Sequence, residues 1–195
     1  SADGFLGRKD AIDVIVIFNE ATAAKDIERV REGGLILYDD SSPLPANLKR
    51  EGVQYLGVPA EKIVQKHVET GPLRLKQRNM VYVGALAFLF GIDLETIKEV
   101  LEDTFGDKPA VIESNLRCIE VAYNEMKERG AKQDISRLEK IPDGNKGKII
   151  TEGNTAAALG AIYGGVSVVC WYPITPSSSL AEALERYLPR LHKAP

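Results

Sequence analysis

A threonine held between two prolines is the feature of this sequence best suited to chemistry. Thr175 follows Ile174 and precedes Pro176, and Pro173 precedes Ile174. Each proline fixes its own φ angle and favours an extended backbone at the residue before it, so this stretch should form a rigid elbow. The threonine hydroxyl can donate a hydrogen bond, and a small oxyanion is the ligand that it suits.

Three serines follow the elbow and begin a predicted helix over residues 178–188. The free N–H groups and the positive dipole end of that helix would face the elbow, which again favours an anion. Ser177 and Ser178 could donate to that anion. They could equally only cap the helix, since serine is a preferred N-cap residue in any helix.

A second polar group stands about twenty residues upstream. Asn154 and Thr155 begin a predicted helix over residues 155–163, directly after the predicted strand 148–152 and Gly153. They could line the same crevice as the elbow, although an ordinary N-cap explains them as well. Glu152, at the end of that strand, is a weaker candidate for a general base.

The elbow needs a strand before it. Residues 166–171 read VSVVCW and predict a strand that runs into Tyr172. In open α/β sheets, ligands bind at the carboxyl ends of the strands, which is where this elbow would lie.

The first half of the chain predicts a parallel α/β arrangement. Near-continuous β-branched runs indicate buried strands, and glycines and prolines separate them from segments with helical spacing. We expect strands at 12–18, 35–38 and 53–58, and helices at 21–32, 59–67, 80–90, from 93 onward and at 109–129. Gly33-Gly34 should stop the first helix, and Asn79 and Asp93 should cap later ones.

Residues 131–147 are polar, charged and rich in turn formers, and we interpret them as a linker between two domains. Asp39-Asp40 is weak evidence for a metal, because two carboxylates in a turn lack further ligands. The single histidines His67 and His192 are expected at the surface.

The composition is typical of a globular protein, and the sequence shows no obvious targeting signal. The 195 residues are 44% hydrophobic and 27% charged, with a net charge of −3, which gives no electrostatic case for nucleic acid or a membrane anchor. The longest apolar run, residues 80–90, is about half a membrane span. Cys118 and Cys170 lie in apolar contexts and are expected to be buried, reduced thiols that bind no metal, as in a cytoplasmic protein.

The elbow and the Gly-Asn turn together resemble the signature of the 2-oxoacid:ferredoxin oxidoreductases. The matching residues are Gly153-Asn154-Thr155-Ala156 and Tyr172-Pro173-Ile174-Thr175-Pro176-Ser177-Ser178. Residues 12–130 are similar to the gamma domain of that family, through DVIVIFNE, GGLILYDDSS, GVPA, NMVYVGALA and the stretch from EVLEDTF to IEVAY.

The resemblance implies a fold and a domain order. Residues 1–130 would be a Rossmann-like, parallel-sheet gamma domain, and 148–195 the first strands and helices of a thiamine-diphosphate-binding (pyrimidine-type) α/β domain of alpha type. This order is similar to the fused large subunit of the two-subunit enzymes. The family's GxGGQG turn is absent, and its activating glutamate and substrate-binding arginine cannot be assigned, so we expect a fragment that is inactive alone.

The resemblance also implies an activity. The complex would oxidatively decarboxylate a 2-oxoacid, such as 2-oxoglutarate or a pyruvate-like acid, to acyl-CoA with ferredoxin as electron acceptor. Thr175 would contact the substrate carboxylate, with Tyr172, Pro173, Ile174, Ser177 and Ser178 around it and Asn154 and Thr155 toward the cofactor.

Thiamine diphosphate with Mg²⁺ would be shared with a partner beta subunit in a hetero-oligomer. Iron–sulfur clusters would belong to that subunit. Coenzyme A would be a substrate, and Asn19 and Glu20 could face its path or the domain interface. Two alternatives stay open: a non-catalytic assembly or regulatory module, and a Rossmann-like nucleotide binder, which the absence of GxGxxG after a strand disfavours.

Overall fold

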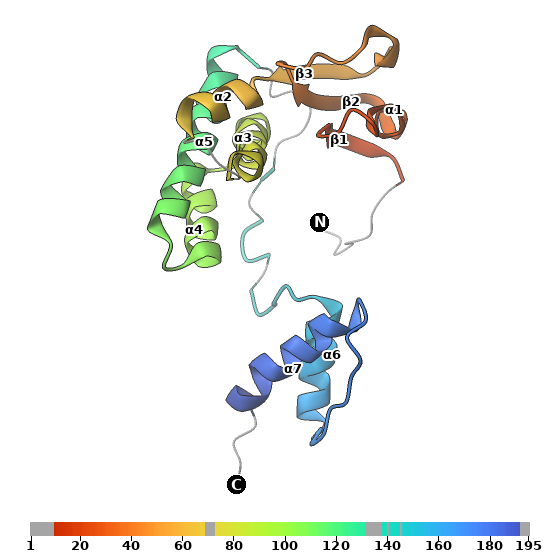
Figure 1. Cartoon of the computed structure of the whole chain (residues 1–195), viewed down its shortest axis with the longest axis vertical. Coiled ribbons are helices and arrows are strands. Elements are labelled where there is room, and N and C mark those ends of the chain that lie inside the picture. The colour runs from red at the N-terminus through yellow and green to blue at the C-terminus, as the bar shows by residue number, and fades with distance from the viewer. Residues whose placement is uncertain (1–9, 69–72, 132–137, 140, 145, 192–195) are drawn as a thin grey trace. The chain divides into compact units, whose positions relative to one another are not determined.

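The computed structural model of the chain describes residues 10–68, 73–131, 138–139, 141–144 and 146–191. The chain divides into two compact units, Ser1–Lys140 (unit 1) and Ile141–Pro195 (unit 2), shown in Figure 1. The boundary lies inside the predicted linker, of which residues 132–137, 140 and 145 fall outside the described part.

Unit 1 is built on a three-stranded parallel sheet in the order β1-β2-β3. The strands are β1 (Ile12–Val16), β2 (Val30–Asp39) and β3 (Gln54–Val58). Helix α1 (Ala23–Glu28) connects the first two strands, and a single 3-10 turn, η1 (Ala46–Leu48), precedes the third. The predicted parallel α/β arrangement of this half is therefore confirmed.

Apolar side chains cover both faces of this sheet. Leu35 and Leu37 of β2 belong to a core formed with α2 (Ala60–His67), α3 (Leu73–Phe90) and α5 (Pro109–Glu128). Ile36 points to the opposite face, where it packs with residues of α1. This alternation is the period of two that a strand buried on both faces requires.

The central helix of unit 1 is α3, which packs against α5 (Figure 1). Gly84 makes this close packing possible, because a Cβ at this position would collide with the backbone of Ile119. Helix α4 (Leu94–Phe105) packs against α5, and the Asp93 carboxylate accepts a hydrogen bond from the Thr96 N–H at 3.3 Å. The predicted cap at Asp93 is therefore confirmed.

Two predicted boundaries in unit 1 are wrong. Gly33 and Gly34 do not stop a helix but lie inside β2, where a Cβ on Gly34 would sit 2.9 Å from the Asp13 carbonyl oxygen. Gly34 permits this close strand contact, and Gly33 has a φ of +74°, a conformation that favours glycine. Asn79 caps nothing: it is an exposed residue inside α3, which begins at Leu73.

Unit 2 contains two helices, α6 (Gly153–Tyr163) and α7 (Ser177–Leu191), which pack against each other. Ala158, Ile162, Ala183 and Leu184 form their small shared core. The predicted strands at 148–152 and 166–171 are wrong, since the structure has no strand at either segment. A strand needs a hydrogen-bonded neighbour, and a two-stranded pair alone is only marginally stable in water.

The two cysteines differ in environment. Both are free; Cys118 is buried as expected, but Cys170 is exposed, because the segment that contains it packs under no sheet or helix layer. His67 ends α2 and is partly exposed, and His192 lies outside the described residues. Within the described part of the chain, none of the helices combines the length and the apolar character that crossing a bilayer demands.

Candidate functional site

The predicted elbow is an exposed turn that leads into α7. Tyr172 is 75% exposed and Ile174 58% exposed, and Thr175 is exposed between them and the helix. The Ile174 N–H donates to the Tyr172 carbonyl at 2.7 Å, and the Ser177 N–H donates to the Ile174 carbonyl at 2.7 Å. The backbone therefore closes a tight turn around Thr175, but the predicted geometry, a strand that ends in an exposed elbow, is wrong because residues 166–171 do not form a strand.

Side chains hold three carbonyl groups of the elbow. The Ser177 hydroxyl lies 3.0 Å from the Tyr172 carbonyl and 2.5 Å from the Ile174 carbonyl. The Pro176 carbonyl accepts from the Ser179 hydroxyl at 3.1 Å and from the side-chain amide of Asn154 at 2.8 Å. With these carbonyl oxygens engaged, an anion near the elbow meets less repulsion from unpaired oxygen lone pairs.

Asn154 brings the two predicted polar groups together. Its side-chain nitrogen donates to Pro176 and, at 2.7 Å, to the hydroxyl oxygen of Ser179. Since Asn154 lies in the first turn of α6 and Ser179 in the first turn of α7, the two helix N-termini are adjacent. Two positive dipole ends at one place favour a bound anion more than either end alone.

The remaining predicted residues occupy different positions around the elbow. Thr155 and Ser178 are partly buried in the first turns of their helices, and Pro173 is exposed. The hydroxyl of Ser177 has one proton, which is directed to backbone carbonyls, so its role here is to shape the turn. Glu152 is exposed and its side chain makes no cap hydrogen bond to α6.

The hydroxyl of Thr175 forms no hydrogen bond with any other residue that the structure describes. The exposed Thr175 hydroxyl is therefore available to a ligand, and the partly buried Ser178 hydroxyl also has no partner among the described residues, whereas those of Ser177 and Ser179 are engaged. This arrangement can bind and orient a carboxylate or another small oxyanion.

A second polar cluster, which sequence reasoning did not assemble, lies at the carboxyl edge of the sheet in unit 1. Asp39, only 6% exposed, accepts from the Glu61 N–H at 3.1 Å and lies 3.6 Å from Nε of Arg78. Asp40 pairs with Arg129 at 2.9 Å and with Lys62 at 3.6 Å. The Asp39-Asp40 pair is visible in the sequence, but its cationic partners come from helices that lie far away in the chain.

Tyr82 completes this cluster from α3. Burial raises the pKa of the Tyr82 phenol to about 12, and the nearby Asp39 carboxylate adds to the rise, while Arg78 opposes it. Its ring packs edge-on against Phe18 at 4.9 Å between centroids. Asp39 and Asp40 form ion pairs with Arg78, Lys62 and Arg129, so the cluster connects β2 to α2, α3 and the end of α5. Asp40 Oδ1, Arg78 Nε and the Tyr82 hydroxyl are buried there without a hydrogen-bond partner in the described part of the chain. No group of three metal-ligating side chains occurs among the described residues.

Asn19 and Glu20 follow β1 at the same edge. The Asn19 side chain accepts from the Ala21 N–H at 2.9 Å, and Glu20 accepts from the Ser42 hydroxyl. These bonds close the loops after β1 and β2. The predicted role of both residues at a coenzyme A path or a domain interface stays a prediction.

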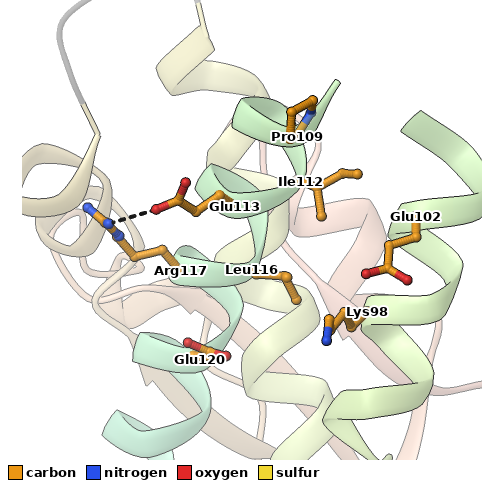
Figure 2. A pocket seen from close by; sticks show the side chains of 8 residues that line it. All are labelled: Lys98, Glu102, Pro109, Ile112, Glu113, Leu116, Arg117 and Glu120. Atoms are coloured by element: carbon orange, nitrogen blue, oxygen red, sulfur yellow. Dashed lines mark hydrogen bonds and ion pairs between the residues drawn. The ribbon is translucent and has the colours of Figure 1, made fainter. Parts of the chain in front are cut away.

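A shallow groove lies between α4 and α5 (Figure 2). Ile112 and Leu116 contribute apolar side chains, and the rim carries three glutamates with Lys98 and Arg117. Arg117 is 3.4 Å from Glu113 on its own helix, as Figure 2 shows. The groove lacks a set of converging donors and is richer in acid than in base, so it does not suit an anionic substrate.

Comparison with known sequences and structures identifies the family. Residues 5–125 match the sequence profile described as pyruvate ferredoxin/flavodoxin oxidoreductase. A 2-oxoacid:ferredoxin oxidoreductase subunit alpha of Aeropyrum pernix is 24% identical over 90% of this chain and 33% of its own length. The ketoisovalerate oxidoreductase subunit VorA of Methanothermobacter thermautotrophicus is 34% identical over 57% of this chain and 22% of its own.

A solved structure matches nearly the whole chain. The 2-oxoglutarate:ferredoxin oxidoreductase of Magnetococcus marinus, with 2-oxoglutarate, coenzyme A and succinyl-CoA bound, is 30% identical with a TM-score of 0.75. The match covers 93% of this chain and 31% of that one, so the chain spans about a third of its structural relative. With the α/β sheet of unit 1 and the elbow of unit 2, these matches place the chain in the pyruvate ferredoxin/flavodoxin oxidoreductase family.

Proposed function

We propose that this chain is part of a subunit of a complex that oxidatively decarboxylates a 2-oxoacid to acyl-CoA and passes the electrons to ferredoxin. The observation that carries the proposal is the elbow, where an unengaged Thr175 hydroxyl lies beside two helix N-termini. A 2-oxoacid presents a carboxylate, which is the kind of group that such donors bind.

The substrate is a 2-oxoacid of the 2-oxoglutarate or pyruvate type. Thr175 donates to its carboxylate, and the first turn of α7 adds the positive dipole end. Tyr172, Pro173 and Ile174 form the exposed wall on one side of this hydroxyl, and Ser177 and Ser178 form the helix start on the other. Fixing the carboxylate orients the reacting carbonyl and reduces the entropy cost of the reaction.

The adjacent helix N-termini also fit an anionic cofactor. Asn154 and Thr155 lie in the first turn of α6 on the cofactor side of the elbow. Thiamine diphosphate, when bound, supplies the electron sink for decarboxylation. The described residues contain no acidic cluster for Mg²⁺, so its ligands and part of the diphosphate site would come from a partner beta subunit.

The domain assignment follows the same proposal. Residues 1–130 form the gamma-type domain, 131–147 the linker, and 148–195 the first part of an alpha-type domain that binds thiamine diphosphate. The compact units separate between residues 140 and 141, inside that linker, which supports this division. Coenzyme A is the acyl acceptor, and the beta subunit carries the iron–sulfur clusters of the hetero-oligomer. Two free thiols favour a reducing compartment, so we assign the assembly to the cytoplasm.

The proposal is tested with Thr175→Ala in the complete oxidoreductase. Loss of one hydrogen bond to a charged group should reduce kcat/KM for the 2-oxoacid about ten- to a hundred-fold. Thr175→Ser, which keeps the hydroxyl, is the matched control and should retain most of the activity. The measurement is coenzyme A-dependent dye reduction across 2-oxoacid concentrations. Unchanged kcat/KM in Thr175→Ala would reject the carboxylate role and favour the assembly-module alternative.

A further inference from the structure

The side-chain amide of Asn154 donates both of its protons in hydrogen bonds around the elbow. One goes to the Pro176 carbonyl at 2.8 Å and the other to the Ser179 hydroxyl oxygen at 2.7 Å. A carbonyl oxygen can only accept a hydrogen bond, so the amide nitrogen must face Pro176. An aspartate of the same size would place a charged acceptor against that carbonyl instead.

The two sides of Thr175 are anchored differently. Before it, the Ile174 carbonyl is held by Ser177, a residue of the same turn. After it, the Pro176 carbonyl is held by the nearby Ser179 and also by Asn154 of α6, which lies 22 positions away in the sequence. The contacts of Ser177 can therefore fix the shape of the turn, whereas the contacts of Asn154 fix where the turn lies relative to α6.

We propose that Asn154 is a positioning residue for the 2-oxoacid, which acts by holding the Thr175 elbow at a fixed place beside the N-terminus of α6. This inference rests on the function proposed above for Thr175. Asn154 touches the elbow, and in this role it does not touch the substrate. It therefore affects substrate affinity through Thr175 and has no separate contribution to the carboxylate contact.

The test is a double-mutant cycle in the complete oxidoreductase with Asn154→Asp and Thr175→Ala. Asn154→Asp alone should raise KM for the 2-oxoacid about ten-fold, with kcat and KM for coenzyme A changed less. In the Thr175→Ala background the same change should alter KM less than about two-fold, because the group that it positions is gone.

Two further variants control for folding and chemistry. Asn124→Asp makes the same chemical change at an exposed position of α5 and should leave all kinetic constants unchanged. Ser179→Ala removes one acceptor of Asn154 and the hydrogen bond from Ser179 to the Pro176 carbonyl, but keeps the bond from Asn154 to Pro176, so a two- to three-fold rise in KM is expected. Ser179→Ala also provides the measurement if Asn154→Asp does not assemble.

The outcomes separate the inference from the function on which it rests. If Thr175→Ala raises KM while Asn154→Asp and Ser179→Ala do not, the inference is wrong and the proposed function stands. Equal effects of Asn154→Asp in both backgrounds would also overturn it, since Asn154 would then act elsewhere. If Thr175→Ala itself has no effect, both proposals fall.

Discussion

Units 1 and 2 differ in how much of their apolar surface they cover. Ten of the thirteen large apolar side chains exposed among the described residues belong to unit 2, including Ile150, Val168 and Trp171. Unit 1, with more than twice the residues, buries its strands between helices on both faces. Unit 2 therefore leaves much more of its apolar surface exposed than unit 1 does.

The polar groups show the opposite trend. The acidic pair of unit 1 pairs with cations and holds elements of the fold together, whereas the elbow of unit 2 is exposed and keeps the Thr175 hydroxyl unengaged. The better packed polar cluster is therefore not the better candidate for a ligand-binding site. Ion pairs between separate elements stabilise a fold, whereas an exposed, unengaged donor beside helix N-termini can bind a ligand.

The largest expected effect is on stability, when a methyl group is added to a helix glycine in each unit. Gly84→Ala should destabilise unit 1 by about 3 kcal/mol, because the added methyl group meets the Ile119 backbone, which cannot move aside. Gly160→Ala in α6 is the matched change in unit 2, where nothing lies within 4 Å of the added group. It should stabilise α6 by about 1 kcal/mol through helix propensity alone.

Hydrogen exchange measures both glycine variants in one protein. Protection of amides in α3 and α5 should fall in Gly84→Ala, and protection in α6 should rise in Gly160→Ala. Similar small effects in both variants would contradict the contrast in packing between the units.

The second largest expected effect is on the free energy of unfolding at alkaline pH. The pKa of Tyr82 is raised to about 12 in the folded protein from an ordinary value near 10, so the folded state holds this proton more tightly than the unfolded state does. The stabilisation is complete below about pH 10 and is lost as the pH rises to about 12, a fall of roughly 2–3 kcal/mol.

Tyr82→Phe should remove this fall in the free energy of unfolding, as measured by urea denaturation between pH 9 and 12. Tyr172→Phe, at a side chain that is 75% exposed, is the control and should retain the wild-type pH dependence. A Tyr82→Phe variant that declines with pH as steeply as the wild type would show that other groups cause the loss.

The smallest effect concerns charged contacts at the surface of each unit. Arg129→Met should destabilise unit 1 by about 1 kcal/mol, since it breaks a partly exposed ion pair with Asp40 and a second with Glu125. Arg186→Met in α7 removes a cation that lies 5.5 Å from the Tyr187 ring and should cost about 0.5 kcal/mol or less. Denaturation at low and high salt checks the order, because added salt should reduce the Arg129 effect.

Local patterns predicted much of unit 1 and missed where its elements begin. The β-branched runs at 12–18 and 53–58 are strands, and the cap at Asp93 is present. Gly33-Gly34 looked like a helix stop because glycine ends helices, but the same residue type also allows close contact between strands. The folded structure distinguishes the two, because a Cβ on Gly34 would meet the Asp13 carbonyl across the sheet as well as Val30 and Arg31 of its own strand.

The residues alone determined that Thr175 lies in a tight elbow before a helix, since two prolines and three serines restrict the backbone locally whatever surrounds them. They did not determine whether 148–152 and 166–171 are strands, because a strand exists only when another strand pairs with it. Nor did they show which hydroxyl of the elbow is unengaged. That depends on Asn154, Ser177 and Ser179 reaching specific carbonyls, and only the packing of α6 against α7 brings those groups together.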